Sequence, residues 1–325
     1  MATLMAGCAS IVTRLPEIDA PALATERTLQ QDLALARVDA LQTHLMRVAD
    51  RIRTANADLC ARTRPGIGLK THTLSNYSKT LRPAVARELG AADEPRVLTV
   101  VPDSPADLAG IAQGDALIVE GRAVRHGSKA FREALASGRI EVRRDGQVRE
   151  VAVTPRPECA YDVRLRMSSS INAFATGSSI TVTSGMLDFV DGDRELALIL
   201  GHELAHNTQA HIPKIVRNYV LSLGGTRYAR PFESEADYVG LYYMVRAGYA
   251  PDGVEAFWRR LALVSPRNTG RAKTHPTTPE RFVRIAAARA EIAAKQAAGE
   301  VLVPNYLDAA PDAALGAESD AGGGS

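Results

Sequence analysis

A largely apolar run at residues 196–211 includes three histidines and one glutamate: LALILGHELAHNTQAH. Apolar residues occupy all sides of the helix that this run predicts, as in a helix that passes through a protein core. Asp191 or Asp193 can cap the helix N-terminus. His202 and His206 are four residues apart, which places their Cβ atoms on one face, roughly 5–6 Å from each other. We therefore expect the chain to fold around a buried helix that presents two neighbouring imidazoles.

Two imidazoles placed in this way can both bind one zinc ion, at about 2.0–2.1 Å. Glu203 is rotated by about 100° from His202 on the helix, which puts its carboxylate beside the ion, where it can hydrogen-bond a bound water. Without a ligand, two histidines and a glutamate in a core would cost several kcal/mol of desolvation. We therefore interpret the run as a metal site rather than as a buried helix with isolated polar residues.

A second expected helix, at residues 232–245, offers carboxylates for the third protein ligand that a zinc peptidase needs. The motifs around the two helices are, in order, NAFATG, VTSGML, GHELAHNTQAH, ESEAD and HPTTPERFVRI. Together they resemble zinc metallopeptidase family 48, the HtpX-like, BepA-like and Oma-type gluzincins, over residues 158–290. The resemblance implies one Zn²⁺ per chain and a zincin-like, mostly helical peptidase domain.

The resemblance also implies a role for each matched carboxylate. Glu233 would be the third zinc ligand, and Asp237, one helical turn further on, would orient a zinc-bound histidine. Glu203 would be the general base that takes a proton from water and later delivers it to the leaving amine. Glu235 points to another face of the helix and is expected in a structural salt bridge. The alternative for this helix is a stabilising network of its three carboxylates with arginines.

Two residues of the downstream motif match the family's histidine and arginine. His275 would lie next to the metal, where it would either stabilise the oxyanion or occupy the fourth coordination position and keep the enzyme latent. A histidine before a proline can also simply begin a helix. Arg281 would support Asp237 or the developing charge. His211 is expected beyond the site, as a supporting or a surface residue.

The segment INAFATG at residues 171–177 would be the edge strand above the active-site cleft. By the same resemblance, Asn172, Ala173 and Phe174 would hold an extended protein or peptide substrate through main-chain hydrogen bonds. An ordinary internal strand is the alternative.

A small β-rich unit begins near RPGIGL at residues 64–69, and its centre reads VLTVVPDSPADLAGIAQGDALIVEGRAV. These residues resemble a PDZ domain of the bacterial protease-associated type. By that resemblance, the N–H groups of Gly66, Ile67, Gly68 and Leu69 would bind a peptide C-terminus while a strand edge takes up the chain. A PDZ-shaped spacer that binds no peptide is the alternative.

The expected fold is α+β, with a long amphipathic helix and the PDZ-like domain ahead of the metallopeptidase domain. Apolar residues at three- and four-residue steps from Leu29 to Val48 predict the long helix. The C-terminal residues are small, acidic and glycine-rich, which predicts a disordered tail. The predicted boundaries are 1–24 for a signal remnant and tether, 25–60 for the helix, 61–156 for the PDZ-like domain, 157–298 for the peptidase and 299–325 for the tail.

The three cysteines bear on the compartment. The start MATLMAGC resembles a bacterial lipobox, so Cys8 is a candidate for lipid attachment, with an ordinary N-terminus as the alternative. If Cys8 carries lipid, Cys60 and Cys159 remain as a pair, which suits an oxidising compartment such as the periplasm; two free cytosolic thiols are the other reading. No apolar run reaches the roughly 18–20 residues that span a bilayer. The net charge of +2 gives no reason to expect nucleic-acid binding.

These observations predict a zinc endopeptidase that faces the periplasm, is anchored to the membrane only through a lipid on Cys8, and acts on misfolded or envelope proteins. One alternative is a PDZ-led chaperone or adaptor whose metallopeptidase domain is latent. Another is an exopeptidase that trims peptides.

Overall fold

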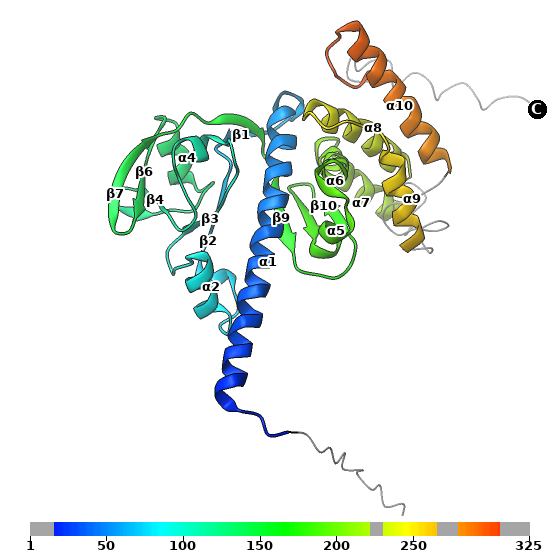
Figure 1. The fold of residues 1–325 in the computed structure, drawn as a ribbon. Helices are drawn as coiled ribbons and strands as arrows, with labels where there is room; N and C mark the ends of the chain where they lie inside the picture. The colour runs from blue at the N-terminus through cyan, green and yellow to red at the C-terminus, as the bar shows by residue number, and fades with distance from the viewer. Residues whose placement is uncertain (1–15, 222–229, 265–278, 306–325) are drawn as a thin grey trace, which may run out of the picture.

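The computed structural model describes residues 16–221, 230–264 and 279–305, which form two lobes on either side of one long helix (Figure 1). Three predictions concern residues outside these ranges: the lipid site at Cys8, the role of His275, and the disorder of the tail beyond residue 305. Within the described ranges, no helix is both long enough and apolar enough to cross a membrane.

The long helix between the lobes is α1, Ala20–Ala55. Asp19 caps its N-terminus by accepting a main-chain N–H at 2.9 Å, so the helix begins inside the segment that was expected to be a tether. Leu45 is fully buried, whereas Leu29 and Leu33 are 51% and 62% exposed. The predicted apolar face is therefore confirmed from Leu35 onward and wrong at Leu29 and Leu33, in the first turns of α1, which project beyond both lobes (Figure 1).

The β-rich lobe lies on one side of α1 (Figure 1). Its largest sheet is antiparallel with the order β5-β4-β6-β7, and β2 pairs separately with β3. Its core is built by Ile67, Leu117, Phe131 and Val142. Its elements are β1 (Thr63–Gly66), β2 (Leu69–His72), η2 (Leu74–Asn76), α2 (Arg82–Leu89), β3 (Arg96–Val100), α3 (Pro105–Leu108), β4 (Ala116–Val119), β5 (Arg122–Ala123), α4 (Lys129–Leu135), β6 (Arg139–Arg144) and β7 (Gln147–Ala152).

The second lobe is mostly helical and holds a three-stranded sheet of order β10-β11-β9. Strand β11 runs parallel to β9 and antiparallel to β10. Every residue of α6 from Glu195 to Asn207 is buried, which confirms the predicted core helix. The elements are β9 (Asp162–Arg166), β10 (Ala173–Ala175), β11 (Ser179–Thr183), α5 (Ser184–Phe189), α6 (Gly192–Thr208), α7 (His211–Leu221), α8 (Arg230–Arg246), α9 (Val254–Val264) and α10 (Pro279–Ala298).

Helix α1 also contributes to the core of the helical lobe. Leu45, Val48 and Ile52 pack in one cluster with residues of α6, α8 and α9. Farther toward its N-terminus, Leu35 packs against α2 of the β-rich lobe. Helix α1 therefore packs into the cores of both lobes.

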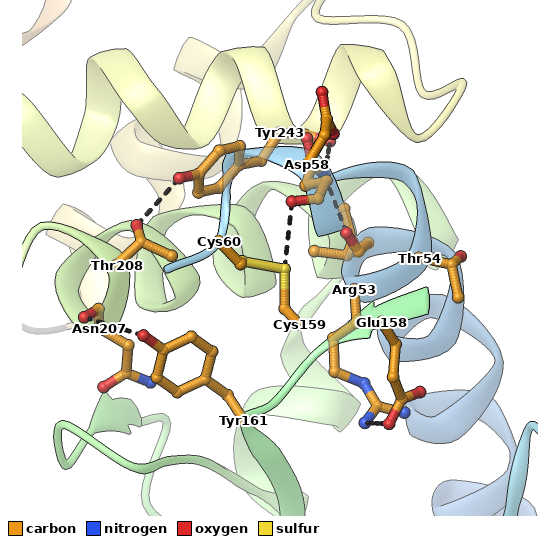
Figure 2. The surroundings of a disulfide bond; sticks show 12 residues. Arg53, Thr54, Asp58, Cys60, Glu158, Cys159, Tyr161, Asn207, Thr208 and Tyr243 are labelled. Carbon is orange, nitrogen blue, oxygen red and sulfur yellow. Dashed lines mark hydrogen bonds and ion pairs between the residues drawn. A yellow bond between two sulfur atoms is a disulfide. The ribbon is translucent and has the colours of Figure 1, made fainter. Parts of the chain in front are cut away.

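A disulfide between Cys60 and Cys159 links the chain segments that enter and leave the β-rich lobe, where α1 ends (Figure 2). Cys60 follows the short helix η1 (Ala57–Leu59), and Cys159 ends β8 (Arg156–Cys159), which pairs with β1. Their Cα atoms are 5.6 Å apart, and the two residues are separated by 99 positions in sequence. The pairing of these two cysteines is thus present in the structure, and the reading with two free thiols is not.

Candidate metal centre

Helices α6 and α8 cross at two glycines, which lets their backbones approach closely. A Cβ on Gly201 of α6 would lie 2.5 Å from the carbonyl oxygen of Gly240, and a Cβ on Gly240 would lie 2.7 Å from the main-chain nitrogen of His202. No side chain fits at either position without moving a helix. The crossing therefore brings the acidic face of α8 next to the histidine face of α6.

The crossing gathers three candidate ligands, His202 and His206 from α6 and Glu233 from α8. All three side chains are buried, and one ligand atom of each lies within 4.8 Å of the others. The two Nε2 atoms are 3.1 Å apart. Each is also near a Glu233 oxygen, at 3.5 Å for His202 and 3.4 Å for His206. The structure thus brings together the three residues that the sequence predicted.

These spacings fit a single tetrahedral ion. With metal–ligand bonds of about 2.0–2.1 Å, neighbouring ligands of a tetrahedral zinc ion lie about 3.3–3.4 Å apart, close to the 3.1, 3.4 and 3.5 Å observed. The ring nitrogens also require a positive charge, because two imidazole lone pairs at 3.1 Å repel each other unless a proton or a cation lies between them. The donor set of two imidazoles and one carboxylate suits zinc.

His202 is oriented by Asp237, whose Oδ1 lies 2.9 Å from the ring Nδ1. Arg281 of α10 donates to the same carboxylate oxygen at 2.6 Å. Burial alone would lower the pKa of His202, but the hydrogen bonds and charges of Asp237 and Glu233 outweigh it and raise the pKa to about 10. The pKa of Asp237 is lowered, because the charge of Arg281 and the contact with His202 outweigh its burial. The surroundings of His202 therefore favour positive charge.

His206 has a different partner. Its Nδ1 lies 3.0 Å from Nδ1 of His211, and the other ring nitrogen of His211 lies 3.0 Å from Oε2 of Glu235. The expected salt bridge of Glu235 is therefore made to a histidine next to the site. His211 is fully buried and directly contacts a candidate ligand, so the alternative that it is a surface residue is wrong.

Glu203 is the residue directly after His202 on α6 and is 2% exposed. Its negative charge acts on the ring of His206, where it raises the pKa against the larger lowering by burial. A buried carboxylate that is close to the candidate ligands without being one of them has the position that a general base requires.

Strand β10, which contains Ala173 and Phe174, lies at the edge of its sheet and contacts α6. Within the described strands its only partner is β11, so the predicted edge position is observed and the internal-strand alternative is not. Asn172, just before β10, has its carbonyl bound to the N–H of Thr183 at 3.0 Å. Asn207 connects the turn after β10 to α6, because its side-chain oxygen accepts the N–H of Gly177 at 2.7 Å.

Two supporting residues have no signal in the sequence. Trp258 of α9 lies under the guanidinium of Arg281, 3.5 Å from the ring centre, and its ring is 5.7 Å from that of His202. Asn207 follows directly after the HELAH motif, yet nothing in its spacing predicts a contact with the β10–β11 turn. Both contacts depend on how helices and strands pack, so local patterns could not reveal them.

The predicted peptide loop at 66–69 connects β1 to β2, and its two apolar side chains are buried. A Cβ on its first glycine would lie 2.5 Å from Glu158 Oε2, and one on its second glycine 3.5 Å from Asp50 Oδ1. Asp50 is paired with Arg156, and Glu158 with Arg53 at 2.8 Å (Figure 2). A peptide carboxylate at this loop would meet two carboxylates already there, and peptide capture stays a prediction.

Comparison with known proteins bears on the helical lobe. The model of peptidase family M48 matches residues 138–224 and 214–289. The mitochondrial metalloendopeptidase OMA1 of Schizosaccharomyces pombe is 24% identical over 165 residues, which cover 42% of this chain and 49% of that protein. The β-barrel assembly-enhancing protease of Escherichia coli K12 is 27% identical, with 35% of this chain and 31% of that protein covered.

A third relative is the metalloprotease LoiP of Escherichia coli K12, which is 26% identical over 152 residues, covering 38% of this chain and 60% of LoiP. The match thus spans about half of the fission yeast protein, and it spans less than two thirds of each bacterial protein. The matching region of this chain contains the buried cluster of two histidines and a glutamate. The chain therefore carries a peptidase family M48 domain at residues 138–289.

Proposed function

We propose that this chain is a zinc-dependent endopeptidase that cleaves unfolded or misfolded proteins. The observation that carries the proposal is the spacing of His202, His206 and Glu233, which matches the edges of one tetrahedral zinc site. The names of the relatives, two metalloendopeptidases or metalloproteases and one protease, support the same reaction class.

Bound zinc would supply Lewis-acid polarisation of the scissile carbonyl and a water of lowered pKa. Glu203 would take the proton from that water and deliver it to the leaving amine. Asp237 and Arg281 would hold His202 in its ligating orientation. His275 would either stabilise the oxyanion or close the fourth position, and it lies outside the described residues.

Substrate would bind in an extended conformation along the free edge of β10. Strand β10 contacts α6 and has an unpaired edge in the described sheet. An edge strand can pair with one further strand by main-chain hydrogen bonds. Asn172, Ala173 and Phe174 would contribute that edge. Recognition through the main chain tolerates many side chains, which suits an enzyme that acts on unfolded proteins.

We further propose a periplasmic location, with a role in quality control of envelope proteins. The support is the disulfide between Cys60 and Cys159, because disulfides persist in oxidising compartments. Two relatives from Escherichia coli belong to a bacterium that has such a compartment, and one of them is named for assembly of β-barrels. Attachment through a lipid on Cys8 belongs to the same proposal.

The Glu203→Gln variant tests the reaction. We expect it to bind zinc as the wild type does and to lose cleavage of casein at internal bonds, detected by mass spectrometry of the products. Glu195→Gln on the same helix is the matched control, because Glu195 pairs with Arg260 two turns away from the ligands. Full cleavage by Glu203→Gln would contradict the proposed base. Unchanged biological activity of a variant that no longer cleaves would favour the adaptor alternative. Products shortened only from their ends would indicate an exopeptidase.

A further inference from the structure

We infer that His211, held by Glu235, is a positioning residue that fixes the orientation of the metal ligand His206. The inference deepens the proposed function and rests on the metal site described above. It concerns a chain of three side chains, Glu235–His211–His206, that runs from the edge of the molecule to the candidate ligand cluster.

The hydrogen-bond pattern determines which ring nitrogen of His206 faces the ion. Its Nε2 lies 3.4 Å from Glu233 and 3.1 Å from His202, so this nitrogen must offer its lone pair to a metal. Its Nδ1 then carries the proton and donates it to Nδ1 of His211, 3.0 Å away. His211 must accept at Nδ1, which leaves the N–H at its Nε2 to donate to Glu235 Oε2 at 3.0 Å. Each tautomer is fixed by the next residue along the chain.

The local fold holds His211 in place from both sides. The ring stands at 78° to that of His206 and lies against Phe232 at 35°, with both ring centres 5.0 Å away. His211 is fully buried. Between α6 and α7, Ala210 has a φ of 52°, a left-handed conformation that costs a residue with a Cβ roughly 1–2 kcal/mol. This turn lets the chain fold back so that the first residue of α7 meets the last ligand of α6.

The two ligand histidines therefore have different supports. His202 contacts a carboxylate directly, and Arg281 neutralises that carboxylate inside the protein. His206 contacts a neutral ring, and the carboxylate that orients this ring, Glu235, has a side chain that is 34% exposed. Groups that orient metal ligands typically contribute about 10- to 100-fold in metal affinity. We expect a contribution in this range from the Glu235–His211 pair.

The test is zinc affinity, measured by competition with a chromophoric chelator on metal-free protein. His211→Leu and Glu235→Leu should each weaken zinc binding by about 10-fold or more. His211→Gln, which retains a hydrogen-bond acceptor, should bind more tightly than His211→Leu. His44→Leu is the matched control, because His44 also pairs with a carboxylate, Asp193 at 2.9 Å, but at the opposite end of α6. It should bind zinc as the wild type does.

The absorption spectrum of the cobalt-loaded protein gives a second readout. A change in the d–d bands of both leucine variants, with none in His44→Leu, would support a change in ligand geometry. If His211→Leu does not fold, Glu235→Leu decides alone, since its side chain is partly exposed. Wild-type affinity in a folded leucine variant would overturn the positioning role. A wild-type protein that binds no zinc would instead overturn the proposed function.

Discussion

Arg281 is a buried cation, 4% exposed, that links the candidate metal centre to the rest of the helical lobe. Its guanidinium donates to Asp237 and lies over the ring of Trp258. A buried ion pair adds little net stability by itself, because both charges lose their hydration. Removing one partner is costly, however, because the other charge is then left without compensation.

Replacing Arg281 with methionine should therefore lower the free energy of unfolding by about 3–5 kcal/mol. Arg284→Met is the control on the same helix, since Arg284 makes only an exposed pair with Glu280, and it should cost at most about 1 kcal/mol. Urea denaturation of the two metal-free variants measures the difference. Equal losses in both variants would show that Asp237 does not depend on Arg281.

His72 on β2 gives a pH dependence that is independent of the metal site. The residue is 4% exposed, and burial lowers its pKa from 6.5 to about 4. Between these two values the unfolded chain binds a proton that the folded chain does not, so stability falls as the pH falls from 6.5 toward 4. For a single group this amounts to about 2 kcal/mol between pH 7 and pH 5.

The variant His72→Gln should lack that loss. Unfolding free energies of the wild type and the variant, measured at pH 7 and pH 5, should differ in slope by about 2 kcal/mol over the interval. Parallel curves would mean that His72 is protonated as readily in the folded protein as in the unfolded chain.

Helix α1 shows what a periodic pattern can and cannot predict at the scale of an element. The spacing of apolar residues predicts the helix itself, because residues three and four positions apart form one apolar face that packs against a core. It does not predict where the cover ends: the lobes pack against α1 from Leu35 onward, and Leu29 and Leu33 stay exposed. The crossing of α6 and α8 is similar. The sequence predicts both helices, but nothing marks Gly201 and Gly240 as the point of contact.

Two leucines on α1 test this division of the helix. Leu45→Ala should cost about 2–5 kcal/mol, because it removes a fully buried side chain from the helical lobe. Leu33→Ala makes the same chemical change at a position that is 62% exposed, and it should change stability by less than about 0.5 kcal/mol. A large loss in Leu33→Ala, measured by urea denaturation, would mean that a partner covers the N-terminal half of α1 in solution.

The candidate metal ligands could be predicted from sequence because helical spacing and the family resemblance together place them. His202 and His206 share a face by helical periodicity, and the resemblance supplies Glu233 from the second helix. The chain from His206 through His211 could not be predicted, since it depends on the left-handed turn at Ala210. Long-range contacts of this kind follow from the packing of the whole lobe.

At the scale of the whole molecule, the disulfide closes a loop that contains the entire β-rich lobe. Cys60 and Cys159 are 99 positions apart, with β1 through β7 between them. The bond ties the residue after η1, near the end of α1, to the last residue of β8 (Figure 2). Closing a loop of about 100 residues removes chain entropy from the unfolded state, worth up to about 4.7 kcal/mol in the simplest model.

A double variant, Cys60→Ala with Cys159→Ala, should therefore unfold with about 2–5 kcal/mol less free energy than the oxidised wild type. The reduced wild type, kept in dithiothreitol, should approach the double variant. Identical stability of the oxidised wild type and the double variant would mean that the bond does not form, or that it constrains only the folded state.

The central claim is that α6 and α8 together hold one divalent ion between His202, His206 and Glu233. Calorimetric titration of zinc into metal-free protein tests it most directly, with His206→Ala as the comparison. We expect saturation at one ion per chain in the wild type and loss of that tight site in the variant. No saturable binding by the wild type, or equally tight binding by His206→Ala, would contradict the account.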